Sequence, residues 1–83
     1  MIIDKEVAKQ LNLLDAVDHV SDDGTRIEYS DEFRASFVKQ YMDGGSPVAI
    51  FRQAGLDPKL IGYKRIERAT ARWIEPENRH HRA

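Results

Sequence analysis

Glycine and proline divide the second half of the chain into pieces too short for one continuous helix. The stretch "DGGSPVAIFRQAGLDPKLIG", residues 43–62, holds four glycines and two prolines. Glycine favours the end of a helix because it adopts a left-handed backbone cheaply, and proline favours the first turn of the next helix. Each proline here follows a Ser or Asp, which are residue types that cap helix N-termini. We therefore predict two helix ends, at Gly44-Gly45 and Gly55, and two helix starts, at Ser46-Pro47 and Asp57-Pro58.

The segment before these breaks has the pattern of a longer helix over residues 30–43. Ser30 suits the N-cap, and two acidic residues follow it in the first turn, where the helix dipole favours negative charge. Apolar residues recur along this segment at helical spacing, which predicts one buried face. That face consists of Phe33, Phe37, Val38 and Tyr41.

Gly62 is expected to interrupt the helical pattern near the C-terminus. An unbroken helix would place Leu60 and Ile61 on a different side from the apolar residues that follow, and glycine costs about 1 kcal/mol inside a helix. Proline 76 marks an expected helix end, and the tail after it lacks an apolar anchor. We predict a helical turn at 58–61, a break at 62–63, a last helix over 64–75 and a frayed tail at 76–83.

The N-terminal part predicts one short helix and one β-hairpin. Apolar residues at helical spacing over 4–14, with Asp4 as the N-cap, indicate the helix. Extended-type stretches at 17–20 and 25–29 flank the sequence "SDDGT", whose Asp-Gly pair is typical of a tight hairpin turn. A two-stranded hairpin is marginal alone, so its apolar face, with Ile27 and Tyr29, should rest against helices.

Length and composition limit the chain to one small domain over residues 1–83. A chain of 83 residues buries only about 60% of its unfolded surface, so its core must be small. It has no cysteine, which excludes a disulfide framework and a thiolate zinc site. The N-terminus "MIIDKEVAKQ" lacks the long apolar run of a signal peptide or membrane span, so we expect a cytoplasmic protein.

Charge is distributed unevenly along the chain. Residues 1–58 carry six Lys/Arg against eleven Asp/Glu, a balance of −5, whereas residues 59–83 carry seven against three, a balance of +4. Such asymmetry indicates a negatively charged partner for the basic segment. A basic helix face can also be an ordinary solvated surface, and cations near a helix C-terminus stabilise the helix dipole in any case.

The order of these signals resembles a known family of domains. The stretch "YSDEFRASFVKQYMDGGSPVAIFRQAGL", followed by "ERATARW", resembles the helix-turn-helix domain of transposase-type DNA-binding proteins, a homeodomain-like group. The resemblance covers about residues 29–74, and the connection "DPKLIGYK" before the last helix is longer than usual in the family. The matching positions are Tyr29, Ser30, Phe33, Gly44, Gly45, Gly55, Arg72 and Trp73.

The resemblance implies a mainly α fold, in which a homeodomain-like three-helix core at 30–75 follows the helix and hairpin at 4–29. In the last helix Ile66, Ala69 and Trp73 would face the core, with Thr70 at the edge. Arg65 and Arg68, near the helix start, would reach base edges in the major groove. The other expected contacts, to the DNA backbone, come from Lys59, Tyr63, Lys64 and Arg72.

Enzymatic function has little support in the sequence. No phosphate-binding glycine loop is present, and no nucleophile has an evident base. His80 and His81 lack partners at metal-ligand spacing, so we expect no metal and no cofactor. We expect neither a membrane nor a small-molecule partner.

Two hypotheses follow from these patterns. The first is a DNA-binding protein, either a small transcriptional regulator or a transposase-related recognition protein. Because one such domain makes few contacts, tight binding should require a homodimer or a larger protein partner. The second is a protein-interaction module that keeps the helix-turn-helix shape without binding DNA.

Overall fold

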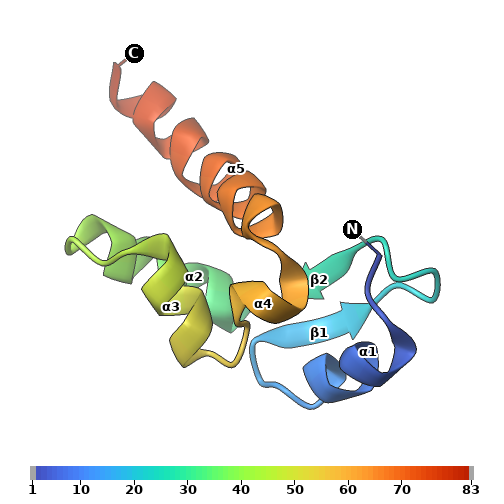
Figure 1. Ribbon diagram of the computed structural model, residues 1–83. Coiled ribbons are helices and arrows are strands. Elements are labelled where there is room, and N and C mark those ends of the chain that lie inside the picture. Colours follow the sequence, from blue (N-terminus) through green and yellow to red (C-terminus); the bar gives the residue numbers. More distant parts are fainter. Residues whose placement is uncertain (1, 83) are drawn as a thin grey trace.

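The elements of the fold follow the predicted order along the chain. The structure is a computed structural model that describes the backbone of residues 2–82 and the side chains of residues 2–74. It is mainly helical with one small antiparallel hairpin, as the sequence predicts (Figure 1). The elements are α1 (Lys5–Asn12), β1 (Val17–Val20), β2 (Ile27–Tyr29), α2 (Asp31–Met42), α3 (Pro47–Gln53), α4 (Pro58–Ile61) and α5 (Tyr63–Arg82).

Side-chain caps set the starts of three helices where the sequence predicts them. At the start of α1, the Asp4 carboxylate accepts a hydrogen bond from the Glu6 N–H. At the start of α2, the Ser30 hydroxyl accepts one from the Phe33 N–H. At the start of α4, the Asp57 carboxylate accepts one from the Lys59 N–H. Ser46 occupies the N-cap position of α3 but makes no side-chain cap hydrogen bond, and Pro47 begins that helix. These local rules account for most of the helix boundaries.

The break between α4 and α5 falls at Gly62, as predicted. Its φ of 88° lies in the region that favours glycine, and its N–H donates to the Pro58 carbonyl. The chain therefore turns out of α4 and starts α5 in a new direction.

The hairpin pairs Val20 with Ile27 and Val17 with Tyr29, with an irregularity in register between Val17 and His19. Ile27 is buried and Glu28 is exposed, so the predicted alternation of the second strand is confirmed. Helix α1 packs against β1 and covers this part of the hairpin.

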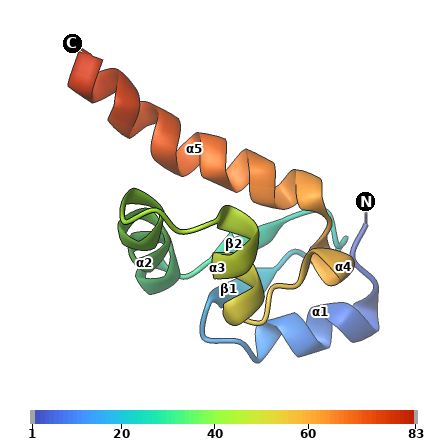
Figure 2. The ribbon, with the colours of Figure 1, turned by 60° about the vertical axis from the view of Figure 1, so that its left-hand side comes forward.

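Helix α5 lies across the helical part of the molecule. It packs on α3, α4 and α2, and its C-terminal half extends past the other elements (Figure 2). Rings from four elements meet beneath it in an aromatic cluster of Tyr29, Phe33, Phe37, Phe51 and Trp73. The core thus joins the hairpin, α2 and α3 to the underside of α5.

The predicted end of the last helix at Pro76 is wrong. Helix α5 continues over Pro76 as far as Arg82, so the segment expected to be a frayed tail is helical over that range. Proline keeps a φ compatible with a helix, but it removes one backbone donor and its ring crowds the carbonyl four residues earlier, so it weakens or bends a helix without always ending it. The side chains of His80 and His81 lie outside the described residues.

Candidate nucleic-acid interface on helix α5

The buried side of α5 follows the predicted apolar spacing. Ile66 and Ala69 are each 2% exposed, and Trp73 packs into the aromatic cluster. Thr70 lies at the edge, where its hydroxyl donates to the Ile66 carbonyl at 2.8 Å. Ile74 is also buried, a residue that the sequence analysis did not assign to the core. This buried side fixes which residues of α5 face outward.

Three cations stand on the outward side of α5, one helical turn apart. Lys64, Arg68 and Arg72 are exposed, and we call this set the basic stripe. At a rise of about 1.5 Å per residue, neighbouring members are separated by about 6 Å along the helix axis. Among the described side chains, neither Lys64 nor Arg68 makes a hydrogen bond or ion pair. Their charges are therefore available to an external partner.

Arg65 lies apart from the basic stripe with which the sequence grouped it. Its side chain is half-buried and points to the hairpin turn. The guanidinium donates to the Ile61 carbonyl at 2.9 Å and to the carbonyls of Gly24 and Thr25, each at 3.3 Å. Of the two arginines expected to reach base edges, only Arg68 is exposed on the outward side.

Tyr63 and Lys59 lie near the start of α5 but not on the basic stripe. Tyr63, 59% exposed, lines a groove on one flank of the helix. Lys59 belongs to α4 and is exposed. Both remain candidates for contacts to a partner that approaches the N-terminal end of α5.

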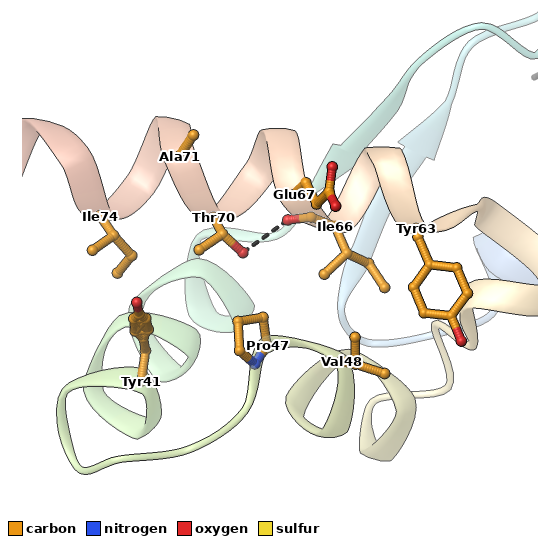
Figure 3. A pocket seen from close by; sticks show the side chains of 9 residues that line it. All are labelled: Tyr41, Pro47, Val48, Tyr63, Ile66, Glu67, Thr70, Ala71 and Ile74. Carbon is orange, nitrogen blue, oxygen red and sulfur yellow. Dashed lines mark hydrogen bonds between the residues drawn. The ribbon is translucent and has the colours of Figure 1, made fainter.

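The groove beside α5 is a feature that the sequence analysis missed. It has a volume of about 510 Å³ and lies between α5 on one side and the end of α2 and the start of α3 on the other. Figure 3 shows Ile66, Thr70 and Ile74 pointing toward Tyr41 and Pro47 across it. The spacing of Ile66, Thr70 and Ile74, four residues apart, was the available signal for a second apolar-lined side of this helix.

Two titratable groups report the electrostatics around the start of α5. Burial raises the pKa of Tyr29 to about 12, although Arg65 and Arg72 favour its ionised form. In the hairpin turn, hydrogen bonds from the Ser21 and Thr25 hydroxyls and the Thr25 N–H lower the pKa of Asp23 to about 2. The turn that Arg65 contacts therefore keeps the negative charge of Asp23 to a lower pH than an ordinary aspartate would.

Neither metal binding nor a membrane span is supported by the described part of the chain. Residues 2–74 contain no group of three His, Asp or Glu side chains that could hold a metal ion. No helix among the described residues is long and apolar enough to cross a membrane. In comparisons with known proteins, no family model, no curated protein and no solved structure matched the chain.

Proposed function

We propose that this chain binds double-stranded DNA through α5, the last helix of a homeodomain-like helix-turn-helix formed by α2, α3 and α5. Its biological role would be that of a small transcriptional regulator or a transposase-related recognition protein. The observation that carries the proposal is the basic stripe of Lys64, Arg68 and Arg72, exposed on a helix whose opposite side is buried.

The packing of α5 supports this proposal. Helix α3 is short and packs against both α2 and α5, which is how a brace helix supports a recognition helix. A major groove about 12 Å wide admits one helix. The buried residues Ile66 and Ala69 hold α5 on the core while its other side remains accessible.

The chemistry of the stripe suggests separate roles for its members. Arg68 is in the middle, and its planar guanidinium can bond the O6 and N7 atoms of guanine in a bidentate manner. Lys64 and Arg72 flank it and would hold phosphates on either side, which positions the helix without reading sequence. Lys59 and Tyr63 would add contacts to the backbone near the helix start.

Binding to duplex DNA over a range of salt concentrations tests the proposal. Fluorescence anisotropy of a labelled duplex of mixed sequence should show binding at low salt that weakens as salt rises. If Lys64 and Arg72 each neutralise one phosphate, they should contribute about −1.8 to the slope of the plot of log K against log salt, since each contact contributes about −0.9. An absence of binding at low salt, or a slope near zero, contradicts the proposal. Selection from a random-sequence pool then separates specific from general binding.

A second candidate function is a protein-interaction module without DNA binding. The groove beside α5 favours it, because its lining is mostly apolar and Tyr63 is exposed at its wall. Glu67 also lines the groove, and residues 1–58 carry a balance of six cations against eleven anions, so a basic protein would suit this surface. Val48→Asp should abolish such an interaction while leaving a DNA complex that depends on Arg68 largely intact, because Val48 lines the groove and is not among the proposed DNA contacts.

A further inference from the structure

We propose that Arg65 is a positioning residue, which fastens the start of α5 to the β1–β2 turn and so sets how the basic stripe faces DNA. The inference rests on the proposed function, because the stripe needs a target to be oriented toward. It assigns a role to the N-terminal helix and hairpin, which the helix-turn-helix resemblance does not cover.

Among the described residues, the guanidinium of Arg65 joins α5 to both α4 and the hairpin turn. One acceptor is the carbonyl of Ile61, the last residue of α4, on the other side of the break at Gly62. Two further acceptors, the carbonyls of Gly24 and Thr25, lie 41 and 40 residues away in the sequence. A planar fork with five donors can serve several carbonyls at once, which a lysine ammonium cannot do with the same geometry. Arg65 therefore fixes the first turn of α5 relative to both α4 and the hairpin.

The acceptors in the turn are themselves held in place. The Gly24 carbonyl also accepts from the Ile3 N–H at 2.8 Å, so the N-terminal segment and α5 share one acceptor. Gly24 has a φ of 73°, and a Cβ there would lie 2.4 Å from the Ile3 carbonyl oxygen. The close approach of these two backbones requires glycine and gives Arg65 a preformed site.

A positioning role and a phosphate-binding role predict different salt dependence. If Arg65 orients α5, its loss lowers the fraction of molecules in the binding-competent arrangement, and the apparent affinity falls by that fraction. The number of phosphates contacted is unchanged, so the salt slope is unchanged. If Arg65 binds a phosphate, its loss makes the slope less steep by about 0.9.

Arg65→Ala and Arg72→Ala form a matched pair for this test. Both remove an arginine from the same helix, but only Arg65 contacts the hairpin turn. We expect Arg65→Ala to weaken DNA binding about tenfold at fixed salt, with the salt slope of the wild type, if the competent fraction falls to about one tenth. Arg72→Ala, at a proposed phosphate contact, should make the slope less steep by about 0.9. A reduced slope for Arg65→Ala, or an unchanged affinity, overturns the inference.

A second measurement tests the contact in the free protein. In NMR spectra, the amide signals of Gly24, Thr25 and Arg26 should shift in Arg65→Ala and not in Arg68→Ala. Arg65→Lys, which keeps the charge, should shift the same signals and recover only part of the affinity. If the wild type fails to bind DNA while these shifts occur, the proposed function fails and the contact stands; if the shifts are absent from both Arg65 variants, the inference fails whatever the DNA result.

Far-UV circular dichroism of each variant shows whether it keeps the helix content of the wild type. If Arg65→Ala has lost helix, the affinity and salt slope of Arg65→Lys are compared with those of the wild type instead, because lysine retains a long side chain and a charge. A folded Arg65→Lys with wild-type affinity and wild-type turn signals contradicts a role for the guanidinium fork.

Discussion

The ring of Tyr29, at the end of β2, meets the indole of Trp73, in α5, edge to face. Their centroids are 5.3 Å apart and their planes are inclined at 87°. Such tilted pairs are favoured by the quadrupoles of the two rings. Trp73 also packs on Phe37 from α2, so the hairpin and α2 both contact α5 at this residue. The aromatic cluster and Arg65 thus hold α5 at two successive places along its length.

Trp73→Ala should strongly destabilise the protein. Truncation of a packed aromatic side chain costs about 3–5 kcal/mol, which is a large share of the stability of a small domain. Urea unfolding followed by circular dichroism measures the loss. Trp73→Phe, which keeps a ring, should cost much less, and exposed Arg68→Ala should stay within about 0.5 kcal/mol of the wild type. A loss below 1 kcal/mol for Trp73→Ala, on the order of a surface change, would show that the cluster is not a principal source of stability.

Tyr29, which is partly buried, should make stability depend on pH in the alkaline range. The folded-state pKa is raised to about 12, above the unfolded value near 10, so the neutral form favours folding. The stabilisation is complete below pH 10 and is lost as pH rises from about 10 to 12, by roughly 2–3 kcal/mol in all. Urea midpoints at several pH values measure this loss.

Tyr29→Phe separates this effect from other groups that titrate at high pH. The variant keeps the ring packing against Trp73 but has no proton to release, so its stability should fall less steeply over the same pH range. An equal fall in both proteins would assign the alkaline dependence to other groups. Absorbance at 295 nm gives a direct check, because one tyrosine should ionise about two pH units above the free side chain.

Most of the fold could be predicted because local signals determine its boundaries. Ser30 and Asp57 cap helices, Gly62 breaks one, and the Asp23-Gly24 pair turns the hairpin, each for a reason contained within a few residues. Pro76 shows the limit of such rules. A proline makes helix continuation costly, but it does not decide alone whether the helix ends.

The candidate site was less predictable because its residues depend on distant contacts. Spacing alone groups Arg65 with Lys64 and Arg68 on a basic helix. The carbonyls that hold Arg65 belong to a turn 40 residues earlier, and no helical period contains that information. The groove beside α5 is likewise formed by Tyr41 and Pro47 from other elements. The helix-turn-helix identity and DNA binding stay predictions.

Neutralisation of two stripe residues should change DNA binding in a defined way. Lys64→Ala with Arg72→Ala removes two proposed phosphate contacts, so the salt slope should become less steep by about 1.8. The matched control is Lys5→Ala with Lys9→Ala, which removes two exposed cations from α1, on the side of the molecule away from α5 (Figure 2). Anisotropy titrations of both double variants make the comparison. If the two double variants changed the salt slope equally, DNA would be attracted to the protein's exposed cations in general rather than to an interface on α5.

Gly24→Ala should destabilise the protein more than Gly44→Ala. Both glycines have a positive φ, 73° and 101°, so a Cβ at either position causes backbone strain on the order of 1–2 kcal/mol. At Gly44 the added Cβ meets no atom within 4 Å, whereas at Gly24 it lies 2.4 Å from the Ile3 carbonyl oxygen. Relief of that overlap must separate the N-terminal segment from the turn and disturb the carbonyls that accept from Arg65. Urea unfolding measures both losses. Equal losses would mean that the turn moves freely, and Arg65 would then have no fixed site to hold.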